Sequence, residues 1–177
     1  MNKFERIQKV LDALQKTSFM RMPSFSHTTL TQRGGLFQDS MKYWVELERI
    51  TEKMGLKWEH PSSPFVIAVI RNACDIDRYF YNYDYHCWED SNKLPKRSSC
   101  LSLEIAESLG IELTAEEKAC IRYLGSEMSN EERRNAFDQY PRQMWLLMVW
   151  AQYAEIENRL SYEGKSNDNN TDAGNNP

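Results

Sequence analysis

Glycine and proline are scarce in this chain, with seven and six among 177 residues. This scarcity disfavours a loop-rich or all-β protein. No apolar run approaches the ~20 residues that a helix needs to span a bilayer. The net charge is −4, and acidic and basic residues are mixed along the chain, so no block of like charge forms a patch. We therefore expect no membrane partner and no nucleic-acid-binding surface that extends over the whole protein. Binding of nucleic acid through a local groove stays open.

The chain also lacks paired cysteines. Its four cysteines stand apart, and none belongs to a C-x-x-C pair, which disfavours a zinc site. The first ten residues, MNKFERIQKV, are amphipathic and charged, unlike a signal peptide. We therefore expect reduced thiols and a cytoplasmic protein.

Apolar residues are abundant enough for one core. They make up 41% of the sequence and include five Trp, nine Tyr and seven Phe. Helical periodicity recurs along most of the chain, and the sequence predicts an all-α domain of about six or seven helices spanning residues 1–163. Residues 164–177 are rich in Asn, Asp and Gly and lack any apolar anchor, so we expect a disordered polar tail there.

Several helix ends can be predicted from local signals. Gly55 is expected to end a helix that begins near Leu36, and Ser63 is expected to cap the next one, with a proline at the first helical position. Thr114 and Ser129 each open a capping box. The first helix, within residues 2–17, carries an apolar stripe expected to face the core of its own domain. The stripe consists of Phe4, Ile7, Val10, Leu11 and Leu14.

Residues 76–97 are aromatic and polar and show no sustained helical period. One interpretation is a long loop or a degenerate hairpin packed by its own rings. The other is a lid or wall that faces a ligand.

Two short segments carry the strongest functional signal. Residues 34–40 read Gly-Gly-Leu-Phe-Gln-Asp-Ser, a glycine turn that opens into a helix. Residues 65–70 are apolar on all sides and predict a buried helix, but polar residues follow at Arg71, Asn72 and Asp75. Together with residues 113–122, these segments resemble the HD superfamily of metal-dependent phosphohydrolases, in a subgroup common in bacteria and phages. The resemblance covers roughly residues 30–158.

The metal ligands of that family are replaced. The first metal histidine falls on Asp39, the His-Asp pair falls on Arg71 and Asn72, a lysine falls on Asp75, and the final aspartate falls on Gln152. Arginine stays protonated and brings positive charge to the place where the cation would bind. The resemblance therefore implies a degenerate HD domain with no catalytic residues, no metal and no cofactor. It also implies a vestigial pocket formed by these five residues.

Two arrangements of that pocket are open. Asp39 and Arg71 would form an ion pair that stands in for the metal as the tie between two helices. Alternatively, the residues have simply drifted, and Arg71 reaches solvent through an open pocket.

Three functions follow from this interpretation. The first is a pseudoenzyme that binds a nucleotide or another phosphate-bearing ligand, with Arg71 as the phosphate contact, or that binds a protein partner. The second is an active HD-type phosphohydrolase with an unrecognised ligand set drawn from His27, His60 or His86. The third is a phage or mobile-element accessory protein that acts by docking on another protein.

Overall fold

A computed structural model describes residues 1–23, 35–125 and 127–151 of the chain. Helices dominate these residues, which confirms the expected helical class; the exception is one small two-stranded sheet. The elements are α1 (Lys3–Gln15), η1 (Phe19–Arg21), α2 (Gly35–Lys53), α3 (Ser63–Ile70), η2 (Ala73–Asp75), β1 (Tyr79–Asn82), β2 (Cys87–Asp90), α4 (Ser99–Ser108), α5 (Ala115–Leu124) and α6 (Asn130–Gln139). A further helical segment covers residues 141–151.

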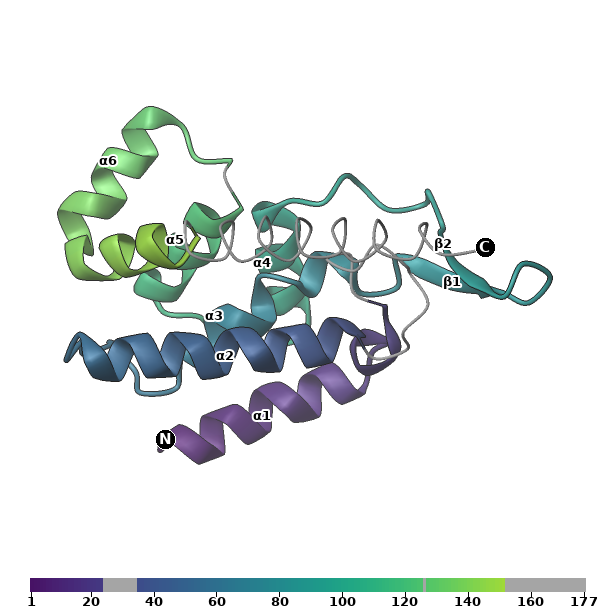
Figure 1. Ribbon diagram of the computed structural model, residues 1–177, viewed down its shortest axis with the longest axis horizontal. Coiled ribbons are helices and arrows are strands. Elements are labelled where there is room, and N and C mark those ends of the chain that lie inside the picture. Colours follow the sequence, from purple (N-terminus) through teal and green to yellow (C-terminus); the bar gives the residue numbers. More distant parts are fainter. Residues whose placement is uncertain (24–34, 126, 152–177) are drawn as a thin grey trace, which may run out of the picture.

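Helix α3 is the centre of the fold. All eight of its residues are buried, because α1, α2, α4 and α5 pack around it (Figure 1). Full burial of each large apolar side chain here, such as Phe65 or Ile67, contributes roughly 1.5–3 kcal/mol. The all-apolar run is therefore a central helix, as the sequence predicts. Arg71 is its C-cap residue, so the polar segment that follows begins where the helix leaves the core.

The predicted start of α3 is wrong by one residue. Ser62, not Ser63, occupies the N-cap position, and it makes no side-chain cap hydrogen bond. The Ser63 hydroxyl instead donates to Glu117 Oε1 at 2.7 Å. The Ser63 hydroxyl, which the sequence predicts to cap the helix, therefore binds a residue of another helix. The other end signals are confirmed: Gly55 has a φ of 54°, and both capping boxes are formed, at Thr114 and at Ser129.

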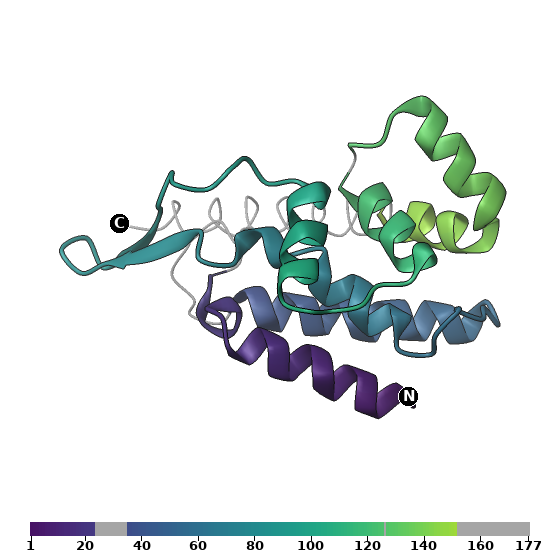
Figure 2. The same cartoon turned by 180° about the vertical axis from the view of Figure 1, so that it is seen from behind.

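Helix α1 buries most of the predicted stripe, because Ile7, Val10 and Leu14 are buried and Leu11 packs against the core, but two positions depart from the prediction. Phe4 is 79% exposed, whereas Arg6 is buried. The reason is a set of partners that Arg6 finds on the neighbouring elements. Its Nη1 and Nη2 atoms donate to Glu117 Oε1 and Oε2, both at 2.7 Å, and Nη2 donates to the Glu112 carbonyl at 2.8 Å. Lys3 pairs with Glu48 at 2.7 Å, so α1 is tied to α2 as well, and the two helices run side by side (Figures 1 and 2).

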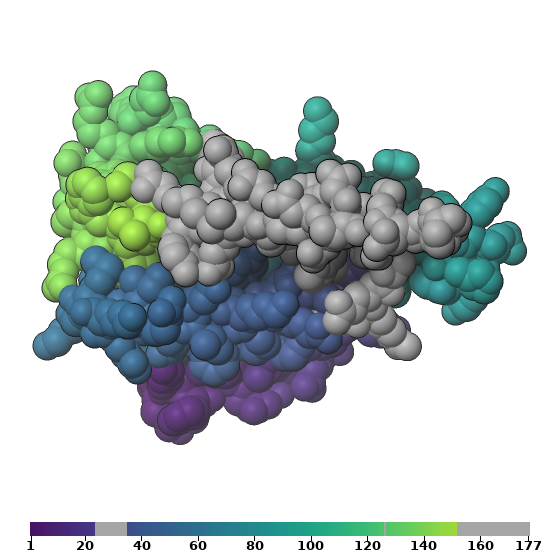
Figure 3. All heavy atoms as spheres, viewed as in Figure 1, coloured from purple at the N-terminus to yellow at the C-terminus, as the bar shows by residue number. Residues whose placement is uncertain are grey.

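Residues 76–97 form a hairpin, which was one of the predicted outcomes. β1 and β2 pair antiparallel, with Tyr79 opposite Asp90. The hairpin projects from one end of the helical body, as both the ribbon and the space-filling view show (Figures 1 and 3). Tyr83 and Tyr85 in its turn are about four-fifths exposed, at 79% and 77%.

The segment 141–151 buries only part of its apolar set. Met144, Leu147 and Trp150 are buried, but Trp145 is 55% exposed. Over the part of the chain that the structure describes, no helix is long and apolar enough to cross a membrane. The predicted tail at 164–177 lies outside that part.

Candidate functional site

A cavity of about 300 Å³ lies where α2, the end of α3, the start of α4 and the end of α5 meet. Four of the five residues predicted from the sequence line it: Asp39, Arg71, Asn72 and Asp75. The fifth, Gln152, lies outside the described residues. The remaining lining residues are Leu36, Tyr43, Cys74, Arg97, Ser98, Ser99, Ile121, Leu124, Gly125 and Glu127.

The ion pair expected between Asp39 and Arg71 is not formed. No carboxylate among the described residues lies within 4 Å of the Arg71 guanidinium, and Asp39 Oδ1 instead lies 3.8 Å from Lys42 Nζ on its own helix. The arginine has a different set of neighbours. Its Cζ atom lies 4.6 Å from the ring centre of Tyr43 and 5.1 Å from that of Trp150. The guanidinium therefore contacts aromatic faces, which attract a cation through the ring quadrupole, in place of the expected Asp39 carboxylate.

The two rings form a defined bracket around Arg71. They meet edge to face, with centres 5.2 Å apart and planes at 86°. The Trp150 indole N–H donates to Glu46 Oε2 at 2.9 Å, which fixes the ring orientation. The rings offer no conventional hydrogen-bond acceptor on their faces, and among the described residues the buried Arg71 Nη1 atom has no hydrogen-bond partner. Burial also lowers the pKa of Arg71 from its usual value, an effect that the nearby Tyr43 and Cys74 oppose.

An unsatisfied buried N–H is costly. Leaving such a donor without a partner costs about 1–3 kcal/mol, and more for a charged group. Buried polar groups in folded proteins are therefore nearly always paired, and an exception requires a physical explanation. Arg71 is one such exception among the described residues, and its side chain lines the cavity.

Asn72 and Asp75 are engaged with protein groups. Asn72 Nδ2 donates to Ser40 Oγ at 3.0 Å, which connects the end of α3 to α2. Asp75 Oδ1 lies 2.5 Å from Arg97 Nε and 3.1 Å from Arg78 Nε. Burial raises the pKa of Asp75, and the two arginines oppose that rise. Asp75 is thus held by two cations from different segments, which limits its repulsion of an incoming anion.

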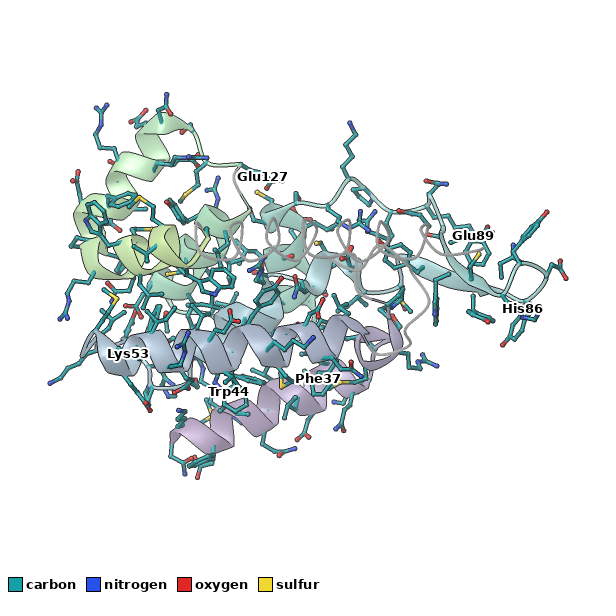
Figure 4. The ribbon with its side chains drawn as sticks, in the orientation of Figure 1. Phe37, Trp44, Lys53, His86, Glu89 and Glu127 are labelled. Carbon is teal, nitrogen blue, oxygen red and sulfur yellow. The ribbon has the colours of Figure 1, made fainter. Side chains whose placement is uncertain are left out.

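The N-terminus of α4 forms the far wall of the cavity. The Ser99 backbone N–H and hydroxyl both donate to Glu127 Oε2, at 2.9 and 2.8 Å. Glu127 lies on the connection between α5 and α6 (Figure 4). Gly125 lets these segments approach closely, because a Cβ atom at that position would lie 2.5 Å from the Ser99 Cβ.

The histidines considered as metal ligands do not gather in the cavity among the described residues. Among the described residues, no group of three or more His, Cys, Asp or Glu side chains is arranged to hold a metal. His60 binds Ser62 Oγ through Nδ1 at 2.7 Å, outside the cavity, and His86 lies exposed in the hairpin turn. His27 lies outside the described residues.

Sequence reasoning missed several residues of the site. Tyr43 could have been found, because it follows Asp39 by four residues and so lies on the same face of α2. Trp150 lies on the segment 141–151, which carries no motif that connects it with the site. Arg97, Ser99 and Glu127 carry no motif, and only the packing of α4 and α5 brings them to the cavity.

Comparison with known proteins returned no relative: no protein-family model, no curated protein and no solved structure matches this chain.

Proposed function

We propose that the chain is a catalytically degenerate, HD-like cytoplasmic protein that binds a nucleotide or another phosphate-bearing ligand in this cavity. The observation that supports the proposal is Arg71. Its guanidinium lies against two aromatic rings, lines the cavity, and has a buried N–H without an acceptor among the described residues.

A phosphate group satisfies what Arg71 lacks. Its oxygens accept hydrogen bonds from a guanidinium, and charge-assisted bonds of this kind are about twice as strong as neutral ones. The bracket of Tyr43 and Trp150 restrains the guanidinium before the ligand arrives, so less side-chain entropy is lost on binding.

The size of the cavity favours a small ligand. At about 300 Å³ it lies at the lower end of ligand pockets. This volume suits a phosphomonoester or a mononucleotide better than a large cofactor.

A thermal-shift screen tests the proposal. Purified protein is mixed with a panel of nucleotides and cyclic dinucleotides, and we expect at least one to raise the melting temperature. Arg71→Met keeps the apolar stem but removes the charge, and it should weaken binding by roughly tenfold or more, which corresponds to a charge-assisted bond of about 1.5–3 kcal/mol. Arg49→Met is the matched control, because Arg49 is exposed on α2 and outside the cavity.

Two results would contradict the proposal. One is a panel in which no ligand stabilises the wild type. The other is equal binding by the wild type and Arg71→Met.

Protein docking is the second candidate function. The observation that favours it is the projecting hairpin, where Phe80, Tyr83 and Tyr85 are large exposed side chains on one small element. Aromatic residues of this kind are enriched in protein interfaces. A silent ligand panel would favour this function, and replacing Tyr83 and Tyr85 by Ser should then abolish binding to a partner while leaving the melting temperature unchanged.

A further inference from the structure

The contact between Ser99 and Glu127 has the geometry of an occupied anion site. One carboxylate oxygen receives two hydrogen bonds from the first residue of α4, from the Ser99 backbone N–H and from its hydroxyl. Backbone N–H groups at a helix N-terminus are favourable donors to anions, because they have no partner within the helix and carry the positive end of its dipole. Glu127 Oε2 therefore occupies the position that a phosphate oxygen would take.

The two partners differ in their surroundings. Ser99 is buried, so its donors are fixed in the wall of the cavity. Glu127 is exposed, so its carboxylate can move into solvent without leaving the chain strained or a charge buried. An anion from outside can therefore replace the carboxylate while the donors stay in place.

Arg71 is an independent sign of a ligand in the same cavity. It lines the cavity together with Ser99 and Glu127, and its Nη1 atom is buried and lacks an acceptor among the described residues. The Glu127 carboxylate, which binds Ser99, accepts no hydrogen bond from Arg71 Nη1. A phosphate has more acceptor oxygens than a carboxylate, so one group could serve donors on both walls.

From these contacts we infer that the cavity takes a small phosphomonoester whose phosphate displaces the Glu127 carboxylate from Ser99, so that Glu127 is an internal competitor that sets the affinity of the site. The inference rests on the proposed function and names its ligand class and its affinity-determining residue. The binding-competent state is the fraction of molecules in which Glu127 has left Ser99, and the apparent affinity is reduced by that fraction.

Calorimetric titration with inorganic phosphate and with AMP tests the inference. Glu127→Gln and Glu127→Asp should both bind more tightly than the wild type, by about fivefold, since the contact resembles a capping bond of ordinary strength. Glu127→Asp is the decisive variant. It keeps the negative charge but shortens the side chain by one methylene, so a gain in affinity there reports lost competition and not lost repulsion.

Two further variants complete the design. Glu131→Gln removes the same charge from an exposed position on α6 and should leave the affinity unchanged. Ser99→Ala removes the hydroxyl donor and should weaken phosphate binding.

The outcomes separate the inference from the proposed function. If phosphate and AMP bind in an Arg71-dependent way but both Glu127 variants match the wild type, the inference is wrong and the proposed function stands. If Glu127→Gln gains affinity and Glu127→Asp does not, competition is also wrong, because charge alone explains the gain. If neither probe binds while a panel nucleotide does, the ligand class is wrong. If no ligand of any kind binds, both proposals fail.

Discussion

Two arginines of this protein lose hydration in opposite ways, Arg6 as a buried residue and Arg71 as a partly buried one. Arg6 is surrounded by acceptors: a bidentate carboxylate, a backbone carbonyl at 2.8 Å and the Ser62 hydroxyl at 3.2 Å. Arg71 is surrounded by aromatic rings and a cavity, and one of its nitrogens lacks an acceptor among the described residues. The first arrangement compensates the lost hydration of the guanidinium, whereas the second leaves part of it uncompensated.

This difference assigns the two residues different roles. The Arg6 network also includes the Ser63 hydroxyl and the Thr114 backbone N–H, both bound to Glu117. It thus joins α1, α3 and α5 through one fully buried carboxylate. A network in which the members satisfy one another has no capacity left for a ligand, so we assign it to stability. The incomplete surroundings of Arg71 support its proposed role in ligand binding.

The largest effect is expected when one partner of the Arg6 network is removed. Glu117→Ala should lower the free energy of unfolding by about 3–5 kcal/mol, because it leaves the Arg6 charge buried and uncompensated. Urea denaturation measures the change. Glu112→Ala, at an exposed position nearby, is the control and should stay within about 0.5 kcal/mol of the wild type.

The double variant Arg6→Met with Glu117→Leu sharpens this test. Because it removes both charges and keeps apolar volume, it should recover much of the lost stability. If Glu117→Ala lowers the free energy of unfolding by less than about 1 kcal/mol, the Arg6 network does not hold the helices together.

A smaller effect on stability is expected at Arg71. Arg71→Met should change the free energy of unfolding by less than about 1 kcal/mol, because the loss of the ring contacts is offset by the removal of an unsatisfied charged donor. The measurement is the same urea titration, with Arg6→Met run beside it. Equal losses in the two variants would remove the distinction between a structural and a binding arginine.

The smallest effect concerns Glu116, the buried neighbour of Glu117 on α5. It accepts hydrogen bonds from the Glu59 N–H and the Gln143 amide, but no cation among the described residues forms an ion pair with it. Burial raises the pKa of Glu116 above its ordinary value of 4.5, although both hydrogen bonds oppose the rise.

The sign of the pH dependence follows from that shift. Between the ordinary pKa and the raised one, the native state binds more protons than the unfolded state, so Glu116 makes the free energy of unfolding fall as pH rises through this window. The stability of the wild type relative to Glu116→Gln should therefore decline from pH 4 to pH 7 in urea titrations. Glu131→Gln, at an exposed site, serves as the control. A relative stability that rises over this range would contradict the burial of an uncompensated carboxylate.

The positions of the helices were predictable because their signals are local. The capping boxes at Thr114 and Ser129 link residues three apart, and the positive φ of Gly55 and Gly110 marks helix ends within one turn. The end of the apolar helix at Arg71 was equally local. Four residues of the cavity were predicted from two such segments. Asp39 belongs to the segment 34–40, and Arg71, Asn72 and Asp75 follow the apolar helix.

The rest of the site depended on contacts between distant segments. Arg6 and Glu117 are 111 residues apart, and nothing in the first helix distinguishes Arg6 from the other charged residues that lie between its apolar positions. The same periodicity predicted Phe4 to be buried along with Ile7, Val10 and Leu14, but Phe4 is exposed.

The sequence by itself determined where most of the helices begin and end, because hydrogen bonds within a turn decide these positions. The start of α3 is the exception, since the Ser63 hydroxyl binds Glu117. Only the tertiary structure decided which charges are satisfied. The free energy of a buried arginine depends on the groups that replace its water, and those groups come from whichever elements pack against it. For Arg6 these are acceptors, and the result is a structural tie. For Arg71 they are the rings of Tyr43 and Trp150, and the result is an arginine that lines a cavity with one donor lacking an acceptor among the described residues.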